Sequence, residues 1–317
     1  MSSGADTIDS LASLLESRYG SGPITLRTLR HGKQIYHVQR AGARDWVLRS
    51  AGVRRYVASL AYLEQHNFPA ARLVRTLNGA LLVEHNDRQF FVMTYVTGDD
   101  PDLSPAPLRL LGATLSRLHS LPLPLTQESP GPCGMLPARE ITYARSRLDA
   151  VRDRVVPAYQ ARFDALVEAC DRIAYLEDLP PVFLHGDCHP WNSIRTPDGE
   201  VILIDWDSAG LGPAVVDLGF LLLSCETGGI PGAVIPRDAA RLDAVIEGYC
   251  LHRMPDDNEL THLPDAIRFR NLVGACASFA HQIENGLPPD EPPWWWQRHQ
   301  MAGEIAERVI RAIEDLR

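Results

Sequence analysis

Residues 183–205 read FLHGDCHPWNSIRTPDGEVILID, and no other part of the chain says as much about its fold. An apolar strand ends in His-Gly-Asp, whose last residue is Asp187, and Asn192 follows five residues later. A β-branched run over residues 201–204 then leads to Asp205. Three acceptor side chains therefore stand on two short strands that we expect to pair as a hairpin.

The turn between these strands predicts their register. Residues 196–200 read TPDGE, a turn signal between two hydrophobic runs. A two-residue loop would place Asn192 directly opposite Asp205, with Cβ atoms roughly 4.5–5.5 Å apart. A type I turn with a glycine bulge would shift the pairing by one residue and leave the two groups neighbours. Oxygen ligands without Cys or paired His favour a hard cation such as Mg²⁺.

These residues resemble the catalytic core of the aminoglycoside phosphotransferase-like family, which shares the protein-kinase-like fold. The motifs that carry the resemblance read HGDCHPWN and LIDWD. The resemblance implies that ATP and Mg²⁺ are cofactors and that the γ-phosphoryl group moves to a hydroxyl of a small molecule. The acceptor would be aminoglycoside-, homoserine- or choline-like. It further implies that Asp187 is the catalytic base and that Asn192 and Asp205 are the metal ligands.

The segment after the hairpin also looks like the family. Gly212-Pro213 and Asp217-Leu218 match its continuation. By this resemblance Asp217 braces the catalytic loop rather than taking part in the chemistry. Asp207 either assists the metal or faces solvent, and the sequence leaves both alternatives open.

Two segments of the N-terminal part are expected to meet the ATP phosphates. Gly32 lies in a turn that could close over them, although an ordinary hairpin turn explains it equally well. Arg49 ends a strand, and the resemblance implies that it meets the α- and β-phosphates; an exposed strand end is the alternative. The family's helix acid that would orient this cation is missing, because residues 53–63 (VRRYVASLAYL) contain no Asp or Glu and Glu64 stands at the far end of the helix.

Residues 93–96 are expected to form the hinge that binds adenine through backbone groups. Met93 and Tyr95 would line an apolar slot for the ring. Both can equally be core residues of a strand.

The predicted fold is α+β, a two-lobed protein-kinase-like fold. Residues 1–96 would form an N-terminal nucleotide-binding lobe, an antiparallel sheet with one main helix at 53–66. Residues 97–317 would form a mostly helical catalytic and acceptor-binding lobe around the hairpin. The helices of this lobe are expected at 108–118, 139–154, 158–177, 213–225, 237–251, 263–285 and 293–316.

Composition excludes some partners. The 317 residues include 31 Lys and Arg against 40 Asp and Glu, a net charge of −9 that argues against nucleic-acid binding. It weakly favours a cationic or neutral acceptor. No segment resembles a signal peptide or a membrane span, so no membrane partner is expected. Six cysteines without a CxxC pair indicate reduced thiols in a cytoplasmic protein. We expect this protein to be either a monomer or a homodimer.

Three rival interpretations remain. A metal-dependent hydrolase could use His185, Asp187 and His189, which share a face of an extended segment. A non-catalytic pseudokinase could bind nucleotide only, as the missing helix acid would suggest. A protein kinase is less consistent with the short segment between Asp205 and Asp217.

Three adjacent tryptophans at 294–296 cannot all face one core, so at least one should be partly exposed.

Overall fold

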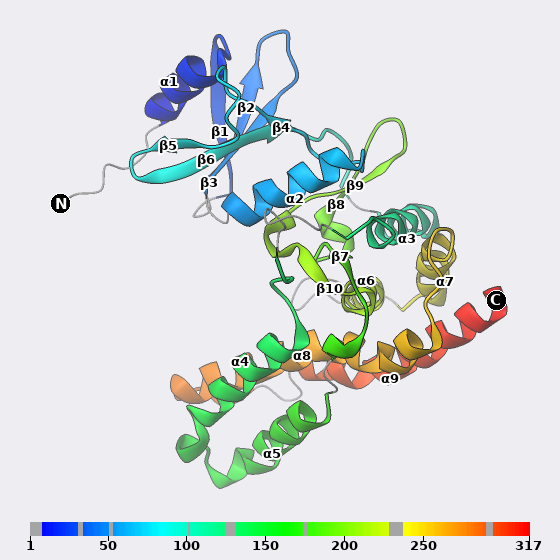
Figure 1. The fold of residues 1–317 in the computed structure, drawn as a ribbon. Coiled ribbons are helices and arrows are strands. Elements are labelled where there is room, and N and C mark those ends of the chain that lie inside the picture. Colours follow the sequence, from blue (N-terminus) through cyan, green and yellow to red (C-terminus); the bar gives the residue numbers. More distant parts are fainter. Residues whose placement is uncertain are drawn as a thin grey trace.

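The computed structural model describes residues 8–30, 34–50, 53–100, 102–123, 131–173, 176–227, 237–289 and 294–317. Gly32, expected over the phosphates, lies outside these residues. In the described part, one antiparallel sheet precedes a largely helical body, and two short ribbons lie between them (Figure 1).

The sheet has six strands in the described residues and runs in the order β1-β2-β3-β6-β4, with β5 also paired to β6. The shortest of these strands, β4, has only two residues. The strands are β1 (Ile24–Arg30), β2 (Ile35–Arg40), β3 (Trp46–Ser50), β4 (Leu73–Val74), β5 (Val83–His85) and β6 (Arg88–Thr94).

Helices cover both faces of this sheet, which explains why every residue of β3 is buried. Helix α1 (Ile8–Tyr19) packs against one face, where Leu48 and Val92 join its core. Helix α2 (Val53–Gln65) packs against the other face, which presents Val47, Phe91 and Met93. Alternate residues of a strand point to opposite faces, so each strand contributes to both cores.

The helical body contains the expected helices in their expected order. Helix α8 begins earlier than predicted, because Asp256 caps it. The Asp256 side chain accepts a hydrogen bond from the Glu259 N–H at 2.8 Å, and the Glu259 side chain accepts one from the Asp256 N–H. The helices are α3 (Pro105–His119), α4 (Pro137–Asp149), α5 (Pro157–Arg172), α6 (Ala214–Thr227), α7 (Ala239–Tyr249), α8 (Asp257–Glu284) and α9 (Trp294–Leu316).

The two ribbons carry the motif residues. Strand β7 (Pro181–Leu184) pairs with β10 (Gly210–Pro213), and β8 (Ser193–Arg195) pairs with β9 (Val201–Leu203). All four are antiparallel to their partners.

Of the two alternatives for the loop between β8 and β9, the two-residue loop does not form. Ser193 pairs with Leu203, and the Thr196 N–H donates to the Glu200 carbonyl at 2.9 Å, which leaves three residues in the loop. Gly199 has φ +87°, a conformation that glycine adopts without strain. The register is therefore the bulged alternative, and the Asn192 carbonyl accepts from the Ile204 N–H at 2.9 Å.

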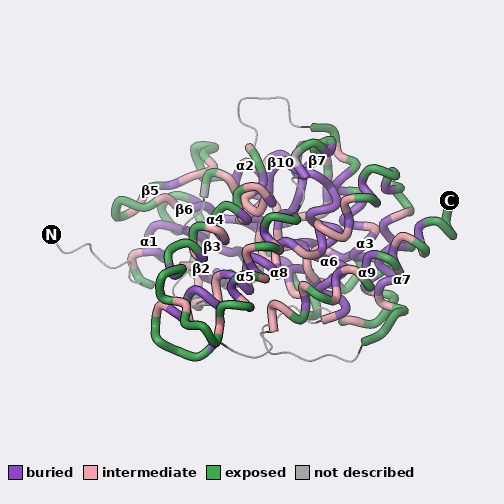
Figure 2. The backbone as a smooth tube through the Cα atoms, turned by 90° about the horizontal axis from the view of Figure 1, so that it is seen from below, coloured by how far each residue is buried: buried purple, intermediate pink, exposed green. Residues whose placement is uncertain are grey.

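Buried residues run through the middle of the helical body and exposed ones line its outside (Figure 2). The described helices include none with the length and apolar character needed to cross a membrane.

Candidate active site

Asp217 on α6 supports the loop that follows β7, the candidate catalytic loop. Its carboxylate accepts the N–H groups of His185 at 2.6 Å and Gly186 at 2.8 Å. The loop is tight, because Gly186 has φ +79° and an added Cβ would lie 2.5 Å from the Ser208 carbonyl oxygen. His119, buried on α3, adds to this support, with its Nε2 atom 3.4 Å from Oδ2 of Asp217. Asp217 thus braces the loop, as the resemblance implied.

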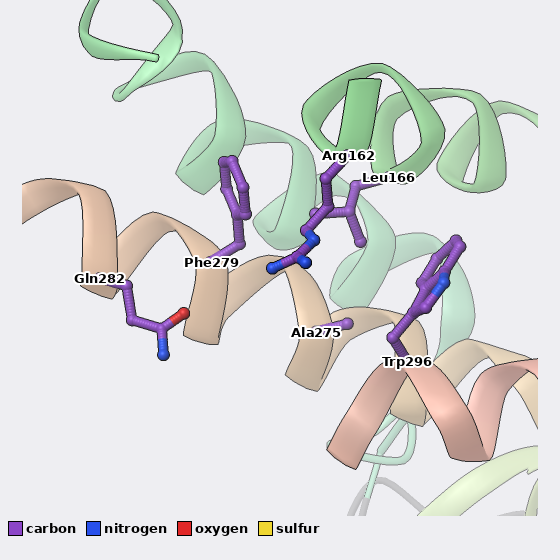
Figure 3. A pocket seen from close by; sticks show the side chains of 6 residues that line it. All are labelled: Arg162, Leu166, Ala275, Phe279, Gln282 and Trp296. Atoms are coloured by element: carbon purple, nitrogen blue, oxygen red, sulfur yellow. The ribbon is translucent and has the colours of Figure 1, made fainter. Parts of the chain in front are cut away.

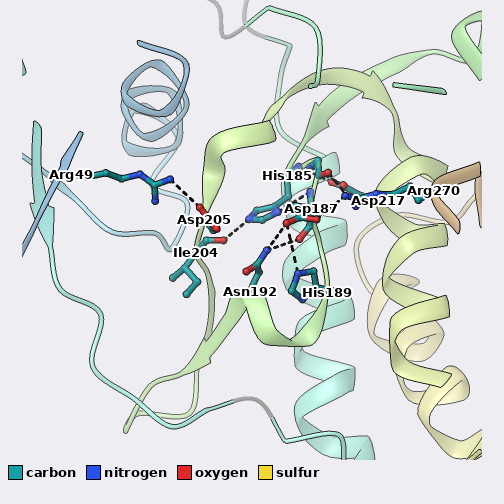
Figure 4. A network of polar contacts seen from close by, with 10 residues as sticks. Arg49, His185, Asp187, His189, Asn192, Ile204, Asp205, Asp217 and Arg270 are labelled. Atoms are coloured by element: carbon teal, nitrogen blue, oxygen red, sulfur yellow. Dashed lines mark hydrogen bonds and ion pairs between the residues drawn. The ribbon is translucent and has the colours of Figure 1, made fainter. Parts of the chain in front are cut away.

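Two polar side chains connect the catalytic loop to the hairpin (Figure 4). The His185 ring is 2.8 Å from the Ile204 carbonyl oxygen, directly before Asp205. The Asn192 amide nitrogen donates to both the main-chain oxygen and Oδ2 of Asp187, each at 3.0 Å. The motif residues 185–192 and the end of β9 therefore form one connected network.

Asp187 faces an arginine that the sequence analysis did not identify. Nη2 of Arg270, on α8, donates to Oδ1 of Asp187 at 2.8 Å. Burial is the largest single effect and raises the pKa of the Asp187 carboxyl, but the charge of Arg270, its hydrogen bond and the two nearby imidazoles together outweigh burial, and the net shift is downward. His189 lies 3.8 Å from Oδ2, yet burial lowers the pKa of this imidazole to about 4, so Arg270 supplies the positive charge at neutral pH.

Asp205 points toward Arg49. It has φ 65° and ψ 61°, a left-handed conformation that is uncommon for a residue with a side chain and turns the chain sharply after β9. Arg49 Nη2 donates to Asp205 Oδ1 at 3.2 Å and also to Asp207. Arg49 is only 5% exposed, so the alternative of a solvated strand end is wrong. Asp207 likewise does not simply face solvent.

Tyr56 on α2 takes the place where a helix acid was expected. The Arg49 guanidinium carbon lies 4.4 Å from the centroid of the Tyr56 ring, a cation–π contact. Tyr56 is 2% exposed, and the Trp206 N–H donates to its hydroxyl group. This side chain therefore connects α2, Arg49 and the turn after Asp205.

The oxygen atoms at the hairpin fit a magnesium ion. The Asn192 amide nitrogen is directed at Asp187, which leaves the amide oxygen as an acceptor. Asp205 and Asp207 add carboxylates, and Mg²⁺ prefers such an all-oxygen set. These three residues are the candidates to hold the ion.

The rival hydrolase site does not form. Among the described residues, no three His, Cys, Asp or Glu side chains gather as metal ligands. His185 is fully buried and faces the Trp206 ring at 4.5 Å. Cys188 is equally buried, and burial raises the pKa of its thiol well above the usual value, which agrees with a packing role.

The predicted hinge lies at the end of β6. Met93 is buried, and the Tyr95 ring lies beside the His37 ring with centroids 4.3 Å apart and planes tilted by 30°. The N–H groups of Thr94 and Tyr95 already donate to the carbonyls of Arg72 and Asp45. Adenine would have to use the remaining backbone groups of residues 93–96.

In the described part of the chain, two cavities adjoin Trp296, and the larger one, of about 390 Å³, is lined by residues of α5, α8 and α9 that include Arg172, Asp265 and His299. Between α5 and α8, Leu166 and Phe279 line a cavity of about 10 Å³ with Trp296 at its side (Figure 3). That volume holds at most one water molecule. All three tryptophans at 294–296 are partly exposed, as expected.

Comparisons with other proteins agree with this geometry. A sequence model described as the phosphotransferase enzyme family matches residues 27–260. An uncharacterized protein of Deinococcus radiodurans is 27% identical over 284 residues, which cover 83% of this chain and 79% of that protein.

Solved structures show the same fold. An amicoumacin kinase in complex with AMP-PNP and Ca²⁺ is 15% identical with a TM-score of 0.65, covering 95% of this chain and 93% of its own. A spectinomycin phosphotransferase in complex with ADP is 14% identical with a TM-score of 0.62, covering 98% and 97%. An ethanolamine kinase of Plasmodium vivax is 14% identical with a TM-score of 0.63, covering 96% and 91%. The predicted two-lobed kinase-like α+β fold is confirmed.

Proposed function

The chain belongs to the phosphotransferase enzyme family, and we propose that it transfers the γ-phosphoryl group of ATP to a hydroxyl group of a small molecule. The resemblance carried by the HGDCHPWN and LIDWD motifs is thereby confirmed. One observation supports the activity most. Asp187, Asn192 and Asp205 belong to one network of polar contacts, in which Asn192 contacts Asp187 while Asp205 faces Arg49. Structural neighbours bound to AMP-PNP and ADP support a nucleotide as the donor.

In the proposed mechanism each residue has one task. Asp187 orients the acceptor hydroxyl and takes its proton, held in place by Asn192 and Arg270. A carboxylate of low pKa is a weak base, which suits a loose transition state in which the proton leaves late. Arg49 donates to the α- and β-phosphates and is held by Tyr56.

Asn192, Asp205 and Asp207 would hold Mg²⁺, which when bound would supply positive charge that neutralises the phosphates of the nucleotide. Residues 93–96, with Met93 and Tyr95, would receive the adenine ring. Residues 1–96 would act as the nucleotide-binding lobe and 97–317 as the acceptor-binding lobe. The free cysteines support a cytoplasmic enzyme.

A turnover screen tests the proposal. Purified protein is incubated with Mg-ATP and a panel of hydroxylated metabolites, aminoglycosides and amino alcohols, and ADP release is measured. We expect acceptor-dependent ADP release that requires the metal and is lost in Asp187→Asn. Nucleotide binding without turnover on any acceptor would favour the pseudokinase alternative, and the absence of nucleotide binding would refute the assignment.

A further inference from the structure

Arg270 places a positive charge directly beside the proposed base. Its guanidinium binds Asp187 at 2.8 Å and lies 3.7 Å from the Phe220 ring centroid, so its position is fixed from two sides. The side chains of Arg270 and Asp187 are 15% and 30% exposed, so both can be reached from outside. An acceptor hydroxyl that meets Asp187 must therefore approach an arginine.

A second guanidinium, that of Arg298, lies on α9 without a negative partner in the described residues. Arg298 is only 3% exposed, and its Nε and Nη2 atoms are buried with no hydrogen-bond acceptor among the residues that the structure describes. Its guanidinium carbon lies 4.4 Å from the Trp294 ring centroid. Burial lowers its pKa to about 10, and the group remains charged at neutral pH. A buried charge that lacks a counter-ion destabilises the folded protein, so the position of Arg298 points to a role other than stability.

Arg270 and Arg298 stand at the same level of two packed helices. Helices α8 and α9 run antiparallel across a short connection (Figure 1). Gly274 faces Trp295, because an added Cβ would lie 2.5 Å from its indole ring. Arg270 is one turn before Gly274 and Arg298 is about one turn after Trp295, so the antiparallel direction brings the two arginines together. Their mutual electrostatic influence agrees with this placement.

Two carboxylates also lie near these arginines. Asp187 is paired with Arg270, and Glu140 on α4 senses the charges of Arg270 and Arg139 while burial raises the pKa of its carboxyl. Arg298 has no acidic partner among the described residues, and its positive charge contrasts with the net charge of −9 of the whole chain, from which a cationic or neutral acceptor was expected.

We propose that the acceptor is a hydroxyl compound that also carries an anionic group, a carboxylate or a phosphate, and that Arg270 and Arg298 bind this group. This inference rests on the proposed function. The acceptor oxygen forms a bond to the γ-phosphorus while the bond from that phosphorus to the β–γ bridging oxygen breaks. The hydroxyl proton passes to Asp187, and ADP leaves. The anionic group stays bound and fixes the distance of the hydroxyl from Asp187.

Anion titration tests the site without an identified acceptor. Malonate and inorganic phosphate, the two minimal probes, are titrated calorimetrically into the wild type, Arg298→Met and Arg308→Met at constant ionic strength. Arg308 is the control, because it lies on the same helix and is paired with Asp243 at 2.6 Å. We expect saturable binding to the wild type and to Arg308→Met, and about tenfold weaker binding or none to Arg298→Met.

Thermal unfolding of the same variants separates binding from folding. Methionine fills a similar volume without a charge, so Arg298→Met should melt no lower than the wild type. Arg298→Lys, which keeps the charge, should retain part of the anion affinity. Equal anion affinity in the wild type and Arg298→Met, or no saturable binding of either probe, overturns the proposal.

Turnover on matched acceptors distinguishes carboxylate from phosphate. Homoserine is compared with its amide, glycerate with glyceramide, and glycerol 3-phosphate with glycerol. The anionic member of a pair should be used with a kcat/KM about tenfold or more above its neutral partner. Better use of choline, ethanolamine or kanamycin than of any anionic compound overturns the anion proposal but leaves the phosphotransferase assignment intact. Failure to bind an ATP analogue with Mg²⁺ instead refutes the proposed function, and the anion titration then still decides this site.

Discussion

Replacing Tyr56 with leucine should weaken nucleotide binding, because Arg49 loses the ring that positions it. The Tyr56 ring is the contact that α2 makes with Arg49 in place of a carboxylate, at 4.4 Å from the guanidinium carbon. Tyr56→Leu removes that ring and also the hydroxyl that accepts the Trp206 N–H. Tyr56→Phe removes only the hydroxyl. The pair of variants therefore separates the cation–π contact from the hydrogen bond.

The structure bounds the size of the effect. A desolvated cation–π contact contributes about 2 kcal/mol, and Arg49 at 5% exposure is well shielded from water. Each 1.4 kcal/mol corresponds to about tenfold in affinity, so a contact fully used to position Arg49 would change the Kd about 30-fold. Asp205 and Asp207 also hold Arg49, so we expect a smaller rise of about tenfold for Tyr56→Leu. The Kd of Tyr56→Phe should rise by about threefold or less, since this variant keeps the ring and loses one neutral hydrogen bond.

Calorimetry with a nonhydrolysable ATP analogue and Mg²⁺ gives the Kd directly. Tyr62→Leu is the matched control, because Tyr62 is also a buried tyrosine of α2 but faces Phe183 with ring centroids 4.6 Å apart. Urea unfolding should show that both leucine variants lose about 1–3 kcal/mol of unfolding free energy. Only Tyr56→Leu should lose nucleotide affinity. Equal affinities of Tyr56→Leu and the wild type would refute the positioning role of this ring.

Three further changes probe the network around the hairpin. Asp187→Asn should retain the affinity for the ATP analogue while acceptor-dependent turnover falls about 10²–10⁴-fold; unchanged turnover would contradict its role as base. Asp205→Ala should lose the part of the analogue's affinity that depends on Mg²⁺, which is measured by comparing titrations with the metal and with EDTA; an unchanged metal dependence would argue against it as a ligand. Burial lowers the pKa of His119, so the unfolded chain binds a proton first as the pH falls. The contribution of neutral His119 to the free energy of unfolding should therefore be fully present above a pH of about 6.5. Below that pH, the free energy of unfolding should decrease by up to about 1.4 kcal/mol per pH unit. Urea unfolding at pH 5 and 7 should show this slope in the wild type and a smaller one in His119→Gln.

The part of the site that the sequence predicted is the part connected by short stretches of chain. Asp187 and Asn192 are five residues apart, and a single turn brings the strand that carries Asp205 back beside them. The proximity of these side chains is therefore set by local geometry. The register of the hairpin was less determined, because a Pro-Asp-Gly turn closes either a two-residue or a three-residue loop. Gly199 at φ +87° selects the longer one here.

The partners of these residues come from distant segments, and their local sequence does not reveal them. Arg270 lies 83 residues after Asp187 and reads as one charged position on a long helix. Tyr56 reads as an apolar position on the buried face of α2, which it also is. Its ring has both an apolar edge for the core and a face of negative potential for a cation, so one residue satisfies both demands. The missing carboxylate of α2 was therefore a true feature of the sequence, but its consequence could be judged only once the neighbours of Arg49 were known. An aromatic ring can orient a guanidinium without adding a further negative charge to those of Asp205 and Asp207, which already contact Arg49.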